Sequence, residues 1–119
     1  MSISNNTDAL LVQLLSASTR RHEVLTNNLA NQNTPGFKRQ TLQFEDLLAQ
    51  ELQERKPDLL SVEPLLVEDE LTPSSPDGNN VNLELEMTGI QQNRLQYELY
   101  SALLSGRAEL LRTAIQDGR

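Results

Sequence analysis

The segment 27–39 constrains the fold more than any other, because it ends a long helical pattern and turns the chain away from that axis. Pro35 cannot continue a helix, and its ring disfavours the helical backbone conformation for Thr34. In the order Thr-Pro-Gly-Phe, Pro35 and Gly36 suit the second and third positions of a type II turn, where the third residue has a positive φ. The sequence therefore predicts a helix that stops near Asn31 and a tight turn after it.

Two amphipathic helices are expected, one in each half of the chain. The first is predicted over residues 8–31, with Thr7 or Asp8 as its cap, and the second over residues 81–117. In both, apolar residues recur at alternating spacings of three and four, the pattern of a coiled-coil seam. The apolar seam positions, which we expect to form the helix-packing interface, are Leu11, Leu15, Leu25, Leu29, Leu83, Met87, Ile90, Tyr97, Leu104, Leu111 and Ile115.

These helices predict a mainly α fold, with an antiparallel coiled-coil-like pair in a single domain of residues 1–119. Polar Ser18 and His22 interrupt the first seam, where they either fix the register or mark looser packing. Gly89 and Gly106 inside the second helix mark either close helix approach or a local bend. At 1.5 Å per residue the second helix is the longer one. We expect a short middle helix to cover the excess length.

The middle of the chain divides into the turn motif 32–43, the short helix 44–55 and an irregular segment 56–80. Four prolines break up the irregular segment, and Leu65-Leu66-Val67 is compatible with a brief strand. Residues 41–80 hold ten acidic and two basic side chains, a net charge of −8. A segment of this composition is expected to be solvated and mobile.

Composition argues against several functional classes. The chain has no cysteine and only one histidine, His22, so neither thiolate chemistry nor a multi-histidine metal site is expected within it. A net charge of −7 without a basic face disfavours nucleic-acid binding. No apolar run approaches the ~20 residues of a membrane span, and no secretory signal is apparent. We therefore expect neither an enzyme nor a cofactor. Only 3% of residues are aromatic, which suits a subunit that completes its core in an assembly.

The turn and its surroundings resemble a known family. Arg21, Val24-Leu25, Asn28-Leu29-Ala30-Asn31 and the run from Asn33 to Lys38 resemble the N-terminal signature of the bacterial flagellar basal-body rod and hook proteins. The C-terminal half matches in order through Asp77-Gly78-Asn79, Leu83-Glu84, Glu86-Met87 and Leu104-Ser105-Gly106, most like the subunits of the proximal rod. The family turn motif comprises Asn28, Asn31, Thr34, Pro35, Gly36 and Phe37.

The resemblance implies a structural subunit that assembles with other rod proteins into a helical tube, which transmits torque and encloses the export channel. The implied partners are other rod proteins, the rod-junction protein, the export gate and the membrane ring. The implied location is the periplasm-spanning rod of the flagellar basal body, reached through the flagellar type III apparatus without a cleaved signal peptide. An alternative function is a cytoplasmic coiled-coil adaptor or export chaperone, which would share the amphipathic helices.

The resemblance also suggests a role for Phe44 and Leu48. Rod and hook-type export substrates carry a phenylalanine followed four residues later by an apolar residue, which the export gate reads. Phe44 and Leu48 fit that form. The plainer interpretation is a surface helix, in which Phe44, Leu47, Leu48 and Leu52 form one apolar face that covers neighbouring elements.

Overall fold

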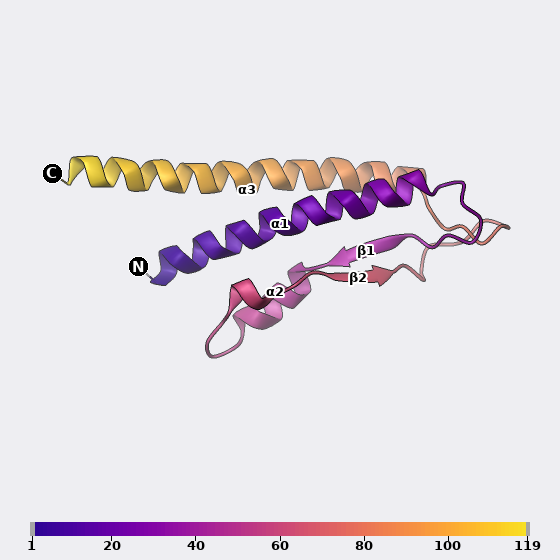
Figure 1. The fold of residues 1–119 in the computed structure, drawn as a ribbon, viewed down its shortest axis with the longest axis horizontal. Coiled ribbons are helices and arrows are strands. Elements are labelled where there is room, and N and C mark those ends of the chain that lie inside the picture. The colour runs from indigo at the N-terminus through magenta and orange to yellow at the C-terminus, as the bar shows by residue number, and fades with distance from the viewer. Residues whose placement is uncertain (1, 119) are drawn as a thin grey trace.

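A computed structural model describes residues 2–118, in which two long helices lie beside a small sheet (Figure 1). Helix α1 spans Ser2–Ala30 and helix α3 spans Leu83–Asp117. The two helices run antiparallel, so both chain ends lie at the same end of the molecule (Figure 1). The expected mainly α fold with an antiparallel helix pair is confirmed.

Helix α1 begins at Ser2 rather than at residue 8, so Thr7 and Asp8 lie inside the helix and do not cap it. The carboxylate of Asp8 instead accepts a hydrogen bond of 2.6 Å from Nε of Arg107 on α3. This ion pair ties the N-terminal part of α1 to α3.

Helix α3 has signals at both ends that match its observed bounds. The side chain of Asn82 accepts a hydrogen bond of 3.2 Å from the Leu85 amide, and Glu84 and Glu86 lie in the first turn. Acidic residues there favour the positive end of the helix dipole. Gly118 follows the last turn, where its amide donates to the Ala114 carbonyl at 3.0 Å.

The middle of the chain is more regular than its composition suggests. Strand β1 (Gln40–Gln43) pairs antiparallel with strand β2 (Leu65–Glu68), in the register Gln40↔Glu68 to Gln43↔Leu65. Between them lie helix α2 (Glu45–Leu52) and a single 3₁₀ turn, η1 (Leu59–Ser61). The brief strand expected near Leu65 is present, whereas β1 lies in the segment expected to be only a turn.

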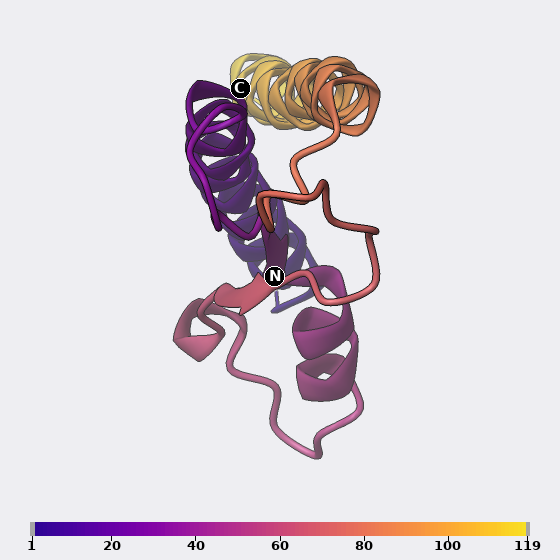
Figure 2. The same cartoon turned by 90° about the vertical axis from the view of Figure 1, so that its right-hand side faces the viewer.

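The apolar core lies between α1 and the middle segment. Phe44, Leu48 and Leu59 pack with Ala17 of α1, and Leu10, Leu14 and Val62 surround this cluster. Figures 1 and 2 show α2 and α3 on opposite sides of α1. The expectation that the short middle helix covers the excess length of α3 is therefore wrong. The small side chain of Ala17 leaves room on α1 for the Phe44 ring, which has no exposed surface.

The contact between α1 and α3 is partly polar. Asn93 is buried and donates a hydrogen bond of 2.7 Å to the Ser18 carbonyl, while its own Oδ1 has no partner among the described residues. The helices approach closely at Gly89, where an added Cβ would lie 3.1 Å from the Leu25 side chain. A Cβ at Gly106 would meet nothing within 4 Å, so only Gly89 marks a close approach.

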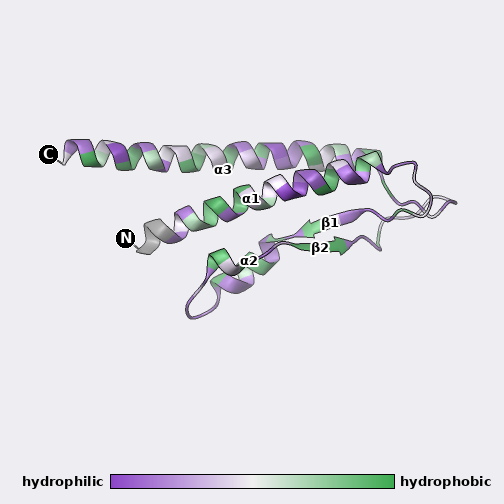
Figure 3. Cartoon of the chain, in the orientation of Figure 1, coloured by the Kyte–Doolittle hydropathy of each residue, from purple (hydrophilic) through white to green (hydrophobic). Residues whose placement is uncertain are grey.

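Consequently, much of the predicted apolar seam does not face α1. Leu11 and Leu25 are buried, and Leu15, Leu29, Ile90 and Leu104 are half-buried. The exposed seam residues are Leu83, Met87, Tyr97, Leu111 and Ile115. Figure 3 shows apolar segments recurring along the whole of α3. Within residues 2–118, no helix combines the length and apolarity that crossing a membrane requires.

Candidate functional site

The turn after α1 has the geometry that its sequence predicts. Gly36 has a φ of +74°, and the Phe37 amide donates to the Thr34 carbonyl at 3.2 Å, as in a type II turn. The Asn31 side chain donates to the Asn27 carbonyl at 2.8 Å and so satisfies a carbonyl of the last helical turn. The Thr34 hydroxyl donates in turn to Oδ1 of Asn31 at 3.1 Å.

A second loop, residues 74–80, docks onto this turn. The side-chain amide of Asn79 donates to the carbonyls of Asn31 and Thr34 at 2.9 and 2.8 Å. The Gly36 amide donates to the Asp77 carbonyl at 2.9 Å. Gly78 also has a positive φ, and an added Cβ there would lie 3.4 Å from Cα of Gly36. The two separate sequence motifs are therefore parts of one structure, which we call the joint (residues 28–39, 74–82 and Glu86).

Asn28 connects α1 to the sheet at the joint. Its amide nitrogen donates to the Gln40 carbonyl at 2.8 Å, and its Oδ1 accepts from the Gln40 amide at 2.9 Å. The Asn28 side chain thus takes the place that a neighbouring strand would occupy beside β1. It has no exposed surface, so these bonds are shielded from water. This explains why asparagine is required at a buried position of the helix.

A buried cluster of charges connects the joint to α3. The guanidinium of Arg39 donates to both carboxylate oxygens of Glu86, at 2.5 and 3.2 Å, and also to the carboxylate of Asp69. Glu86 has no exposed surface and Arg39 is nearly buried. Such a forked pair fixes the orientation of both partners. Asn80 completes the cluster, since its Oδ1 accepts from the Arg39 amide at 2.6 Å.

Sequence reasoning did not identify the residues of this cluster as a site. The partners of Arg39 are carboxylates far from it in the sequence, Glu86 on α3 and Asp69 after β2. The available signal was Glu86, an acidic residue between apolar positions of a helix that packs on another helix. Buried carboxylates require a partner, so a search for a basic residue near the turn would have suggested Arg39.

Hydrogen bonds hold the pKa of the Asp69 carboxyl well below its ordinary value. The Thr72 hydroxyl contributes most, burial opposes the shift, and the Arg39 guanidinium and the amides of Leu71 and Thr72 add to it. A depressed carboxyl pKa stabilises the folded state above the unfolded pKa of about 4, and this contribution declines as the pH falls toward the folded value.

Thr72→Val should therefore lower the free energy of unfolding at pH 7 and raise the pKa of the Asp69 carboxyl toward its ordinary value, because the lost hydroxyl stabilises the ionised carboxylate. Urea denaturation at pH 7 measures the first effect, and an NMR titration of the Asp69 carboxyl measures the second. The matched control is Thr113→Val, whose hydroxyl bonds to the Glu109 carbonyl on α3. An unchanged Asp69 pKa in Thr72→Val would contradict the role given to that hydroxyl.

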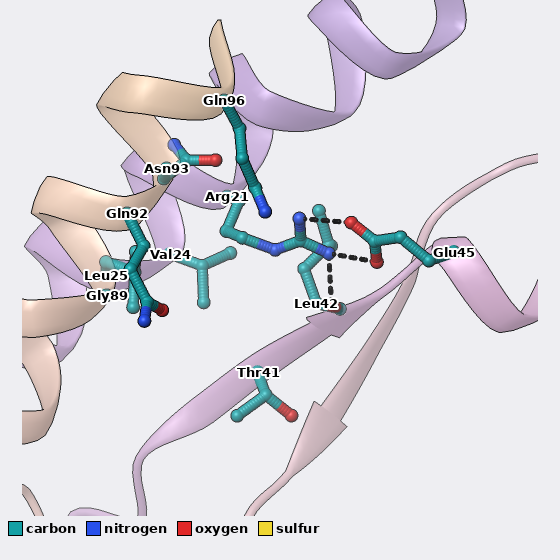
Figure 4. A pocket seen from close by; sticks show the side chains of 10 residues that line it. All are labelled: Arg21, Val24, Leu25, Thr41, Leu42, Glu45, Gly89, Gln92, Asn93 and Gln96. Carbon is teal, nitrogen blue, oxygen red and sulfur yellow. Dashed lines mark hydrogen bonds and ion pairs between the residues drawn. The ribbon is translucent and has the colours of Figure 1, made fainter. Parts of the chain in front are cut away.

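A cavity of about 240 Å³ lies between the helix pair and the sheet (Figure 4). On one side Arg21 donates to both carboxylate oxygens of Glu45, at 2.6 and 2.7 Å, and to the Leu42 carbonyl at 2.9 Å. Asn93 and Gln96 lie on the α3 side (Figure 4). The charged side chains of this cavity, Arg21 and Glu45, pair with each other, so we assign them a structural role. Within residues 2–118, no group of three or more His, Cys, Asp or Glu side chains is placed to hold a metal ion.

Two long helices with exposed apolar side chains, connected through a hydrogen-bonded polar turn, are typical of a structural subunit. A family model described as flagella basal body rod protein matches residues 15–38. Three relatives carry the name flagellar basal body rod protein FlgB. The Bacillus subtilis protein is 31% identical over the full length of both chains. The Escherichia coli protein is 30% identical, covering 89% of this chain and 90% of its own. The Aeromonas hydrophila protein is 32% identical, covering 86% of each.

The chain belongs to the flagellar basal body rod protein family, in which it resembles FlgB. It is a structural component of the flagellar basal-body rod. The family is one of structural proteins rather than enzymes. The family match at residues 15–38 includes the whole turn motif, from Asn28 to Phe37.

The other predicted site residues lie apart from the joint. Phe44 and Leu48, the predicted export-gate motif, are both buried in the core. The predicted packing residues lie along both helices, and those of α3 are mostly exposed. Their roles in export and in contacts between subunits stay predictions.

Proposed function

We propose that this chain is a subunit of the proximal rod, in which α1 and α3 pack with the helices of other rod proteins to form a helical tube. The observation that carries this proposal is the apolar surface of α3. The large apolar side chains exposed on it are Leu83, Leu85, Met87, Leu95, Tyr97, Leu99, Leu103, Leu110, Leu111 and Ile115. So many exposed large apolar side chains on one helix favour its burial against other helices.

The joint has a mechanical role in this proposal. Asn28 of α1 binds the main chain of β1, Asn79 binds the turn that follows α1, and Arg39 binds the Glu86 carboxylate of α3. These bonds hold the sheet and α2 at a set angle to the helix pair. A subunit that transmits torque needs such a rigid connection between its tube-forming helices and its outer segment. No cofactor is required for this function.

The proposed partners are other rod proteins, the rod-junction protein and export gate at the base of the rod, and the surrounding membrane ring. The proposed route to the rod is the flagellar type III apparatus, with Phe44 and Leu48 read by the export gate. Since both side chains are buried in the folded chain, the gate would read them before the chain folds. The adaptor or chaperone alternative lacks a comparable observation, because the matching relatives are named as rod proteins.

Deletion of the gene tests the rod function directly. Cells without this chain should stop basal-body assembly before the rod forms, and expression from a plasmid should restore complete basal bodies. Electron microscopy of isolated basal bodies measures the result. Complete rods in the deletion strain would refute the proposal.

Gly36→Val should reduce the number of complete basal bodies strongly. A valine at a φ of +74° is strained, which costs on the order of 1–3 kcal/mol at the joint. The matched control is Gly106→Val, because neither glycine has a neighbour within 4 Å of the added Cβ and only Gly36 has a positive φ. If the two variants assemble equally well, the geometry of the turn does not matter for assembly.

A further inference from the structure

The outer edge of β2 carries main-chain groups that the chain itself does not bind. Both main-chain groups of Gln40 bond to Asn28, so they point away from β2. Gln40 faces Glu68 in the register, and antiparallel pairs alternate between bonded and non-bonded. The N–H and C=O groups of Leu66 and Glu68 therefore point away from β1. Within residues 2–118, none of these four groups takes part in a main-chain hydrogen bond outside the β1–β2 ladder.

This edge lacks most of the features that usually prevent strand addition. Natural edge strands are protected by central charges, prolines, bulges or a covering segment. In β2, Leu65 and Leu66 are 52% and 44% exposed, and Pro64 precedes the strand instead of interrupting it. Figures 1 and 2 show β2 on the outer side of the sheet, away from α3. By contrast, the inner edge of β1 is closed by Asn28.

The charges around the edge identify the kind of partner. Across the two strands, lined also by Thr41 and Gln43 of β1, lies a hollow of about 650 Å³ that reaches Glu68, Glu70 and the 94% exposed Leu71 at the end of β2. Neither glutamate takes part in an ion pair within residues 2–118, although Asp69 between them is bound to Arg39. Residues 41–80 together carry a net charge of −8. Such a surface attracts basic side chains.

We propose that the outer edge of β2 binds an extended, basic segment of a partner protein, which adds to the sheet as a third strand. Leu66 and Glu68 offer two N–H and two C=O groups, enough for four main-chain hydrogen bonds. Lysine or arginine side chains of the segment pair with Glu68 and Glu70, and apolar ones cover Leu65 and Leu71. This site does not depend on the proposed rod function.

A second copy of the chain is a poorer occupant than a basic segment. Exposed glutamates stand on both sides of β2, with Glu63 before it and Glu68 and Glu70 at its end. Antiparallel pairing of two β2 strands would bring Glu63 of one copy next to the acidic end of the other. Parallel pairing would place like ends together. Both arrangements oppose like charges, which destabilises strand pairing.

The test uses the full chain and two synthetic eight-residue peptides, one alternating lysine with valine and one alternating glutamate with valine. NMR hydrogen exchange follows the amides of Leu66 and Glu68. The lysine peptide should slow exchange at both by about tenfold or more, and the glutamate peptide should not. Equal protection by both peptides, or none by the lysine peptide, overturns the proposal. If the Leu66 and Glu68 amides become protected as the protein concentration rises, without any peptide, the edge binds a second copy of the chain. That result also overturns the proposal.

Two variants separate the backbone from the charges. Leu66→Pro removes an outward N–H that the ladder does not use, so it should abolish peptide binding while the Thr41 amide, which faces β2 in the ladder, stays protected. Leu66→Ala, which keeps the N–H, should still bind. Glu68→Lys with Glu70→Lys leaves the backbone intact and should reverse the preference toward the glutamate peptide. If the charge variant still binds the lysine peptide as strongly as the unchanged chain does, the proposal is refuted. This result decides the question even if Leu66→Pro fails to fold.

Discussion

Arg39→Ala should lower the free energy of unfolding by about 3–5 kcal/mol, the usual cost of leaving a buried charge without its partner. The Glu86 carboxylate has no exposed surface, and without Arg39 it would keep only a hydrogen bond of 3.3 Å from Asn28. Asp69 would lose the same cation. Urea denaturation of the full chain at pH 7, followed by circular dichroism, measures the loss.

The matched control is Arg21→Ala. Arg21 also donates to both oxygens of a glutamate, but Glu45 is half-exposed, with 51% of its side-chain surface accessible. Exposed ion pairs contribute little, although Arg21→Ala also removes the hydrogen bond to the Leu42 carbonyl, so this variant should cost clearly less than Arg39→Ala. A similar loss in both variants would mean that burial of the Arg39 pair is not what makes it important.

A double variant tests the physical cause further. Replacing Arg39 by methionine together with Glu86 by leucine removes both charges and keeps the volume. Buried ion pairs replaced in this way are often neutral in stability. The double variant should therefore be more stable than Arg39→Ala, while Asp69 keeps its hydrogen bonds from Thr72. If it is no more stable, the lost hydrogen bonds matter more than the unpaired charge of Glu86.

Local sequence was sufficient to predict the helices and the turn. Thr34, Pro35 and Gly36 restrict the backbone by their own covalent structure, so the turn follows from three adjacent residues. The spacing of apolar residues similarly predicts a helix without knowledge of its partner. The sequence was therefore sufficient to predict the fold class and the turn that forms the first part of the joint. It was not sufficient to predict that α1 begins at Ser2.

Long-range polar pairing was not predictable in this way. Arg39 and Glu86 are 47 positions apart, and nothing near either residue identifies the other. Strand β1 reads Gln-Thr-Leu-Gln, in which Thr41 is the only residue of the β-branched or aromatic types enriched in strands. It is extended because Asn28 and β2 bind its two edges. Both features arise from contacts that form only when the chain folds.

The spacing of apolar residues also could not predict which face of α3 packs against α1. The apolar pattern predicts contact through Met87, Ile90 and Tyr97, whereas the residues buried against the rest of the chain are Glu86 and Asn93. Because α3 is apolar on more than one side, its spacing fits several seams equally well. The polar contact with α1 leaves many leucines of α3 exposed. In the proposed rod, these leucines would contact helices of other subunits.

Phe44→Ala should have two separable effects, because Phe44 is both the most buried aromatic residue of the core and the first residue of the predicted export-gate motif. Its ring is completely buried against Ala17, Leu48 and Leu59. Loss of a buried phenyl ring costs about 3–5 kcal/mol. Urea denaturation should show this loss of stability. If the export gate reads Phe44 and Leu48, the amount of exported chain should fall as well.

Leu59→Ala distinguishes the two effects, since Leu59 lies in the same core cluster but outside the motif. It should cost about 2–5 kcal/mol in stability and leave export undiminished. Quantitative immunoblots of exported chain, in cells with an intact export apparatus, measure the difference. Equal decreases in both variants would show that stability, not the motif, governs export. If both variants are exported at or above the normal level, Phe44 serves only the core, and folding competes with export instead of following recognition by the gate.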